Sequence, residues 1–228
     1  MNDQLTQLGG RVAVVAKMQT RGLIAVVRAR HRDPLVQVCQ ALADGGVELV
    51  EITMTSPGAL EVIEQASRRL SAHCTIGAGS VLDAETARAA ILAGARFIVA
   101  PVLDRRVIEM AHRYDLPVIP GALTPTEIMT AWQAGADMVK VFPANHFGPR
   151  YFKDLLAPMP QLQLTPTGGV DLTTAAQWLA AGAACLGVGS ALVRQELIDK
   201  GNWAQLTSLA RQFVQVVHKT RSELARQA

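Results

Sequence analysis

The chain has 228 residues, half of them hydrophobic, with 22 basic and 19 acidic residues and a formal net charge of +3. This length allows a large core, either in one domain of the barrel kind or in two smaller domains. No basic cluster with interleaved aromatic residues appears, which excludes the usual footprint of a nucleic-acid-binding protein.

The amino-terminal stretch "MNDQLTQLGGRVAVVAKMQTRG" carries Asp3 early and Arg11 before its short apolar run. It lacks the basic start and the continuous apolar core of a signal peptide. We expect an extra helix here, interrupted at Gly9-Gly10. No apolar run approaches the ~18 residues of a membrane span. The sequence therefore predicts a soluble protein that does not enter a membrane.

Short apolar, branched runs alternate with amphipathic stretches along nearly the whole chain. Alternation of strands with helices implies parallel pairing, because each helix carries the chain back across the sheet. A further amphipathic helix, "WAQLTSLARQFVQVVHKTR", follows the last strand. Eight strands are predicted, at residues 22–28, 49–54, 75–81, 97–101, 117–122, 138–143, 161–169 and 185–192.

Capping signals support the predicted boundaries of these helices and strands. Three dipeptides put a capping side chain before a proline at the first helical position, namely Asp33-Pro34, Ser56-Pro57 and Thr124-Pro125. Thr124 and Glu127 have the spacing of a capping box. Four glycines stand where a helix is expected to end and a strand to begin, namely Gly46, Gly94, Gly135 and Gly182.

Eight βα units in one chain of this length predict a single domain, residues 1–228, with a (β/α)8 TIM-barrel fold and an extra N-terminal helix. A doubly wound open sheet is the alternative. That fold would favour a GxGxxG turn after the first strand, and "VVRARHRD" contains none. Cys39, Cys74 and Cys185 lie far apart without CxxC spacing, as buried thiols of a cytoplasmic protein would.

Two charged residues interrupt buried strands. Side chains alternate along a strand, so every second residue of a barrel strand points inward. In "MVKVFP" the two valines suit the helix-facing side, which points Lys140 inward, and the same reasoning in "LVEITM" points Glu51 inward. The second and sixth strands of an eight-stranded ring lie opposite one another. An acid and an amine are therefore expected to face each other across the interior.

This pair has a structural and a chemical interpretation. As a buried ion pair it would seldom stabilise the fold, because desolvation consumes most of the Coulomb gain. In the chemical interpretation, Lys140 is a nucleophile. Burial disfavours its ammonium form and leaves a free amine that can attack a carbonyl carbon. Glu51 would then serve as general acid and base. We favour the chemical interpretation.

The loops after the last two strands, "TPTGG" and "GVGS", contain glycines that let the backbone approach an anion closely. Barrels often bind phosphate with backbone N–H groups in these two loops. We expect Gly168, Gly169 and the hydroxyl of Ser190 to form such a site.

Other polar residues are candidates at the same end of the strands. Arg28 ends the first strand and can grip a carboxylate bidentately, although a surface arginine in "RARHR" is an equal reading. Ser80 and Thr167 could supply hydroxyls, or be plain loop residues. His146 has no partner at metal-ligand spacing, so we interpret it as a loop residue and expect no metal.

Seven motifs follow one another as they do in one known family: "VEITMTSP", "GAGSVLD", "FIVAP", "VIPGALTPTEI", "AGADMVKVFPA", "TPTGGV" and "GVGSAL". On these motifs, which cover about residues 20–195, the chain resembles the KDPG/KHG aldolases, that is, 2-keto-3-deoxy-6-phosphogluconate aldolase and its relatives. The resemblance implies a class I aldolase without cofactor or metal, on a (β/α)8 barrel that usually assembles as a trimer.

The resemblance also implies roles for residues. Lys140 matches the lysine that forms a Schiff base with the C2 ketone of a 2-keto-3-deoxy-6-phospho sugar acid, and Glu51 matches the general acid/base. The implied products are pyruvate and glyceraldehyde 3-phosphate. The implied substrate contacts are Phe142 beside the imine, Ser80 in place of a carboxylate-binding threonine, Thr167 and Pro101 in matched motifs, and Gly168, Gly169 and Ser190 at the phosphate.

One position departs from the pattern of gluconate-type members, which hold the carboxylate with an arginine four residues after the glutamate. Here that position is Thr55, followed by Ser-Pro. The galactonate-type branch resembles the chain at this point, and also at "FGPRYFK". Arg28 can bind the substrate carboxylate in place of the arginine that is missing at Thr55. The main substrate is thus open between the phosphogluconate, the phosphogalactonate and 4-hydroxy-2-oxoglutarate.

Two other functions use the same fold. A phosphate-sugar epimerase would also use the two phosphate loops, but it relies on carboxylates and often a metal, and it has no need of an interior lysine. A non-catalytic sugar-phosphate sensor would be expected to have lost Lys140 or Glu51, and both are present.

Overall fold

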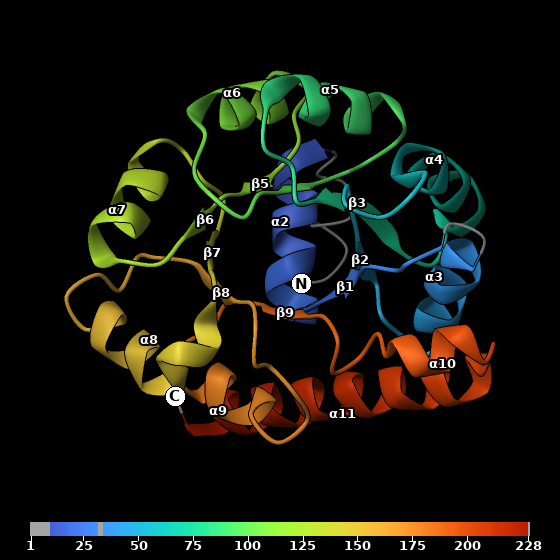
Figure 1. Cartoon of the computed structure of the whole chain (residues 1–228). Coiled ribbons are helices and arrows are strands. Elements are labelled where there is room, and N and C mark those ends of the chain that lie inside the picture. The colour runs from blue at the N-terminus through green and yellow to red at the C-terminus, as the bar shows by residue number, and fades with distance from the viewer. Residues whose placement is uncertain (1–9, 32–33, 228) are drawn as a thin grey trace.

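The computed structural model describes residues 10–31 and 34–227. Most helices surround the strands as an outer layer, whereas α2 lies across the middle of the view (Figure 1). The strands are β1 (Leu23–Val27), β2 (Leu49–Thr53), β3 (Thr75–Gly79), β4 (Ile98–Val99), β5 (Val118–Ile119), β6 (Gly121–Ala122), β7 (Val139–Val141), β8 (Leu164–Pro166) and β9 (Leu186–Val188). The helices are α2 (Gly10–Arg21), α3 (Leu35–Asp44), α4 (Ala59–Leu70), α5 (Ala84–Leu92), α6 (Arg105–Arg113), α7 (Pro125–Gln133), η1 (Ala144–His146), α8 (Gly148–Leu156), α9 (Ala175–Ala180), α10 (Gln195–Asp199) and α11 (Trp203–Gln227).

All strand pairs are parallel, as the sequence predicts. The hydrogen-bonded ladder has two parts, a six-stranded sheet in the order β5-β4-β3-β2-β1-β9 and a three-stranded sheet in the order β6-β7-β8. An isolated bridge between Thr167 and Gly187 links β8 to β9. The predicted fifth strand appears as two pieces, β5 and β6, on either side of Pro120, which has no N–H to donate. Within the described residues the ladder is therefore not a complete eight-stranded barrel.

The strand alternation agrees with the expected facing of side chains. Val50 and Ile52 of β2 and Val139 and Val141 of β7 belong to the main core, between the strands and the helices. A second apolar cluster packs α2 against the inner side of the strands through Val14 and Met18. Its other buried members are Ile24, Leu49, Phe97, Val99, Ile119, Met138 and Cys185. The predicted N-terminal helix therefore covers the amino ends of the strands and leaves their carboxyl ends open. Gly9 of the expected break lies outside the described residues.

The predicted caps have mixed outcomes. Thr124 and Glu127 form the predicted capping box at α7. The four predicted glycines all adopt positive φ at helix ends, namely Gly46, Gly94, Gly135 and Gly182. The prediction for Ser56 is wrong, because Gly58 precedes α4 and the Ser56 hydroxyl bonds elsewhere. Asp33 lies outside the described residues, and Pro34 precedes α3 without a side-chain cap.

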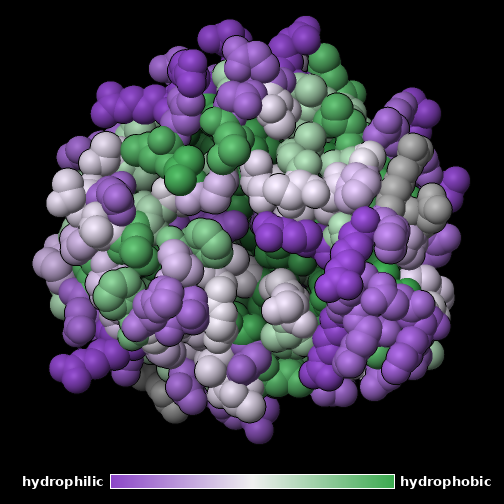
Figure 2. Space-filling view, in the orientation of Figure 1, coloured by the Kyte–Doolittle hydropathy of each residue, from purple (hydrophilic) through white to green (hydrophobic). Residues whose placement is uncertain are grey.

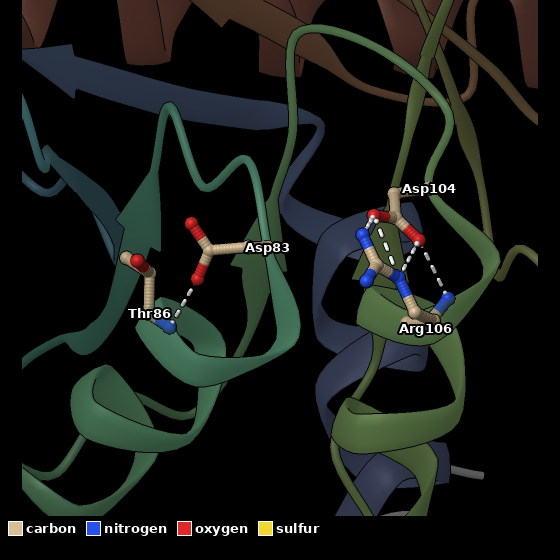
Figure 3. A network of polar contacts seen from close by, with 4 residues as sticks. All are labelled: Asp83, Thr86, Asp104 and Arg106. Atoms are coloured by element: carbon tan, nitrogen blue, oxygen red, sulfur yellow. Dashed lines mark hydrogen bonds and ion pairs between the residues drawn. The ribbon is translucent and has the colours of Figure 1, made fainter.

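Two further caps carry no proline and escaped sequence reasoning. Asp83 accepts a hydrogen bond of 2.6 Å from the backbone N–H of Thr86 and begins α5. Asp104 accepts one of 2.8 Å from the N–H of Arg106 and begins α6, with the Arg106 guanidinium against the same carboxylate. Figure 3 shows both carboxylates at the first turns of these helices. These hydrogen bonds hold the pKa of each aspartate below its usual value.

The carboxyl-terminal helix α11 packs against α3 and α9. Its Arg221 guanidinium donates to the main-chain carbonyls of Gln19, of Thr20 at 2.8 Å and of Ala184 at 2.5 Å, and so ties α11 to the end of α2. None of the helices described here is both long and apolar enough to cross a membrane. Cys39, Cys74 and Cys185 are free and buried, as expected.

Candidate active site

Buried polar side chains gather at the carboxyl ends of the strands. Apart from Thr220, the buried polar and charged residues of the described chain lie on a strand or just after one: Glu51, Thr53, Ser56, Lys140, Thr165 and Thr167. Because the carboxyl ends of parallel strands meet at one edge, these residues face a common region. In the orientation of Figure 1, Figure 2 shows a hollow near the middle of the molecule with hydrophilic and hydrophobic side chains around it.

Glu51 points inward from β2 and is only 2 % exposed. Its Oε1 is buried and has no hydrogen-bond partner among residues 10–31 and 34–227. Burial raises the pKa of this carboxyl above its usual range, against the opposing effect of the Lys140 and Arg28 charges. Such a group takes up and releases a proton more readily near neutral pH than an exposed glutamate does, which suits a general acid/base.

Lys140 lies on β7 between β6 and β8, in register with Gly121 and Thr165. It is 6 % exposed, and its Nζ lies 5.2 Å from the centre of the Phe142 ring. The ring of Phe142 is 40 % exposed, so it can form one wall of the approach to the amine. A pocket of about 420 Å³ lies beside Phe142 and Pro101, and the residues that line it include neither Lys140 nor Glu51. A larger one, of about 660 Å³, lies at the opposite ends of the strands near Lys17 and Thr75, and it contains none of these residues.

Arg28 follows β1 and is exposed at the rim. Its Nη2 lies 3.5 Å from the hydroxyl of Ser80, at the limit of a hydrogen bond. Ser80 follows β3 with a φ of 57°, a value that a serine rarely adopts. The Arg28 charge also opposes the rise in the pKa of Glu51 that burial causes. Arg28, Ser80 and Glu51 therefore belong to one electrostatic environment. A guanidinium and a hydroxyl placed together suit a carboxylate.

The predicted phosphate loops have the expected backbone freedom. Gly168 and Gly169 both adopt positive φ after β8, and a side chain on Gly169 would collide with Asn145. Thr167 is buried and bridges to Gly187 of β9, whereas Ser190 is exposed after β9. Thr55 is exposed, and its hydroxyl bonds to Thr53. His146 lies exposed in η1, as a loop residue would.

Sequence reasoning missed two kinds of residue. Thr53 and Thr165 are buried and polar on the same strand faces as Glu51 and Lys140, and strict alternation would have found them. Gly79 leaves room for the carboxyl group of Glu51, because a Cβ there would overlap it. No sequence signal distinguishes Gly79 from an ordinary strand glycine.

An interior amine, a buried carboxyl and polar loops at the carboxyl ends of parallel strands define an α/β enzyme suited to Schiff-base chemistry. Comparison with known proteins identifies the group. The family model "KDPG and KHG aldolase" matches residues 14–209, so this chain belongs to that family of aldolases, which are lyases.

Two curated relatives and one solved structure show how near the likeness is. The 2-dehydro-3-deoxy-phosphogluconate aldolase of Pseudomonas aeruginosa is 34 % identical, over 85 % of this chain and 88 % of the relative. The 2-dehydro-3-deoxy-6-phosphogalactonate aldolase of Escherichia coli is 38 % identical, over 75 % and 84 %. A KDPG aldolase structure from Legionella pneumophila, with pyruvate captured as a covalent carbinolamine, is 28 % identical, with a TM-score of 0.80 over 86 % of this chain and 96 % of that one.

Proposed function

We propose that this chain is a class I aldolase that cleaves 2-keto-3-deoxy-6-phosphogluconate to pyruvate and glyceraldehyde 3-phosphate, with Lys140 as the Schiff-base lysine and Glu51 as the general acid/base. One observation carries the assignment of roles: a buried amine and a buried carboxyl, whose Oε1 has no partner in the described part of the chain, share the interior of a chain of this family.

The chemistry follows from these two groups. The Lys140 amine attacks the C2 ketone, and loss of water from the carbinolamine gives a protonated imine. Glu51, through a water, takes the proton of the C4 hydroxyl while the electrons of the C3–C4 bond move into the iminium. Glyceraldehyde 3-phosphate leaves, and a pyruvate enamine remains. Protonation at C3 and hydrolysis of the imine release pyruvate and restore both groups.

The remaining residues bind the two ends of the substrate. Arg28 and Ser80 hold the carboxylate, Phe142 and Pro101 form the wall beside the imine, and Thr55 and Thr167 contact the substrate. Gly168, Gly169 and Ser190 bind the phosphate at the other end. The Arg28–Ser80 contact and the positive φ of both glycines support this polarity.

The experiment is reduction with borohydride in the presence of pyruvate. A reduced pyruvyl group should appear on the peptide that contains Lys140 and abolish activity, and Lys140→Arg should remain unlabelled. EDTA should leave activity unchanged. Labelling on another peptide, or inhibition by EDTA, would contradict the class I assignment.

The galactonate substrate is a second candidate. Thr55 occupies the position at which gluconate-type members carry arginine, and the relative named for phosphogalactonate is 38 % identical. Cleavage of the gluconate and galactonate substrates, and of 4-hydroxy-2-oxoglutarate, measured side by side as kcat/KM decides between them.

The proposal extends to the assembly. We propose that residues 1–228 form one (β/α)8 barrel domain that works as a homotrimer in the cytoplasm. Membership of the KDPG/KHG aldolase family, whose resemblance implies a barrel and a trimer, supports the domain and the assembly. The three free, buried cysteines are typical of a reducing compartment such as the cytoplasm. Light scattering after gel filtration should give three times the mass of the chain, and a monomer mass would contradict the trimer.

A further inference from the structure

Three hydroxyl groups lie together where β2 ends. Thr53 is the last residue of β2 and is fully buried, and Ser56 is 4 % exposed. Their oxygens are 3.1 Å apart, and the exposed Thr55 donates to Thr53 Oγ1 over 3.1 Å. The backbone N–H of Ser56 also donates to the carbonyl of Thr53 at 2.9 Å, which closes a tight turn. The three hydroxyls therefore form one connected network between the surface and the interior.

This network ends at the backbone just after the neighbouring strand, β1. The backbone N–H of Ala29 donates to Ser56 Oγ at 3.4 Å, and Ala29 is buried. Ala29 directly follows Arg28. Because the peptide unit between them is planar, a contact that holds the N–H of Ala29 also holds the carbonyl side of Arg28. The sequence predicts Ser56 as a helix cap, but its hydroxyl instead accepts a hydrogen bond that joins the end of β1 to the turn after β2.

The same turn is fastened on its other side to β3. The backbone N–H of Met54 donates to the carbonyl of Gly79 at 2.8 Å. Ser80, whose hydroxyl faces the Arg28 guanidinium, follows Gly79 directly. Residues 53–56 thus lie between the two backbone segments that carry the proposed carboxylate ligands, and they bond to both.

Arg28 depends on this support more than a buried arginine would. Its side chain is exposed, and among residues 10–31 and 34–227 its one side-chain hydrogen bond is the 3.5 Å contact with Ser80. An arginine held so weakly samples many rotamers and must give up most of them when it binds a ligand. The direction of the Arg28 backbone after β1 therefore determines which positions the guanidinium samples.

We propose that Ser56 and Thr53 are positioning residues that act through Arg28: their hydroxyls hold the end of β1 to the turn after β2, whose backbone bonds to β3, so that the guanidinium meets the carboxylate of the keto acid. This inference rests on the proposed function, in which Arg28 binds that carboxylate.

The test measures how much pyruvate gives half-maximal borohydride trapping on Lys140, together with KM and kcat for cleavage. Ser56→Ala removes the acceptor of the Ala29 N–H. Loss of one uncharged hydrogen bond corresponds to about a two- to tenfold change. The half-saturating pyruvate concentration and KM should rise by that factor, while kcat changes less than about twofold, because Ser56 touches neither reacting group. Thr53→Val, which keeps the shape and loses the hydroxyl, should act in the same direction and replaces Ser56→Ala if that variant does not fold.

A double-mutant cycle with Arg28→Ala identifies the route. If Ser56 acts through Arg28, Ser56→Ala should have no further effect on pyruvate trapping in the Arg28→Ala background. The matched control is Ser67→Ala, which removes a serine hydroxyl bonded to the carbonyl of Gly94 at 3.0 Å, away from this edge. It should leave trapping unchanged.

The outcomes separate two failures. Additive effects of Ser56→Ala and Arg28→Ala, or a Ser56→Ala variant with unchanged half-saturation, overturn the positioning role while wild-type trapping stands. Absence of pyruvate trapping on Lys140 in the wild-type protein overturns the proposed function itself, and this inference with it.

Discussion

Gly79 of β3 lies directly against the carboxyl group of Glu51 on β2. A Cβ on Gly79 would overlap Oε1, Cδ and Cγ of Glu51. Gly77, two residues earlier on the same strand, faces the ring of Phe97 in the same way. Successive inward positions of β3 therefore carry no side chain, and the space is filled by Glu51 of β2 and by Phe97, which directly precedes β4. The position of the proposed acid/base depends on a glycine in the next strand.

Gly79→Ala should displace the Glu51 carboxyl and lower kcat by about a hundredfold, since a displacement of the order of 1 Å in a catalytic group can cost that much. Imine formation with pyruvate should continue, because Lys140 lies on β7. Gly77→Ala is the matched control: it crowds Phe97 and should lower the melting temperature with kcat unchanged. Equal effects of both alanines on kcat would mean that general crowding, and not Glu51, is responsible.

Glu51→Gln should still form the imine but cleave at least ~10²-fold more slowly, the usual scale for a positioned acid/base. Single-turnover cleavage together with borohydride trapping measures the two steps separately. Unchanged turnover with a large loss of thermal stability would instead support a structural ion pair between Glu51 and Lys140.

The raised pKa of Glu51 also makes a prediction about stability. The folded state holds the proton to higher pH than the unfolded chain does, so between the two pKa values the folded state binds more protons. Stability contributed by Glu51 is therefore present at low pH and is lost as pH rises through that window. Glu51→Gln lacks this loss, so its melting temperature should exceed the wild-type value at about pH 8, with the difference shrinking towards about pH 4. A variant that is less stable at every pH would contradict a net burial penalty.

Much of the site could be predicted because its residues break a pattern. Lys140 and Glu51 are charges inside apolar strands, and period-two alternation then gives their direction. Thr124 with Glu127 is a local signal that needs no tertiary information. Ser56 shows the limit of such signals: the serine-proline pair resembles a helix start, but the hydroxyl finds a partner in Ala29, which is distant in sequence. Gly79 matters only through Glu51, and a single sequence does not state which residues meet across strands. The division of the fifth strand at Pro120 likewise depends on tertiary structure, because Pro120 has no N–H and the sequence does not show which ladder hydrogen bond that removes.

Asp137 lies just before β7 and joins three elements at the end of the molecule away from the site. Its carboxylate pairs with Arg11 of α2 at 2.5 Å, accepts from the N–H of Val118 at 2.9 Å and lies 3.3 Å from His112 of α6. Hydrogen bonds to a charged group contribute about 1.5–3 kcal/mol, so Asp137→Asn should lower the free energy of unfolding by about that amount, with kcat unchanged at room temperature.

Urea unfolding measures the change. The control is Asp154→Asn, which removes an exposed pair with Arg150 at 3.8 Å and should cost less than about 0.5 kcal/mol. Equal losses from the two substitutions would show that Asp137 does not join α2 and α6 to the sheet in the way its contacts indicate.

The last prediction concerns the two ends of the pocket. With Thr55 in place of an arginine, Arg28 should be the main cation for the substrate carboxylate, and its guanidinium already faces Ser80. Loss of a charge-assisted hydrogen bond costs about 1.5–3 kcal/mol, so Arg28→Ala should weaken pyruvate binding about ten- to a hundredfold. Ser190→Ala should leave pyruvate binding nearly unchanged and raise KM for the phosphorylated substrate, because pyruvate has no phosphate to reach the loop after β9. Pyruvate trapping and the KM of the phosphorylated substrate, measured on both variants, separate the two ends. If Arg28→Ala spares pyruvate and harms only the phosphorylated substrate, Arg28 belongs to the phosphate and the polarity of the site is reversed.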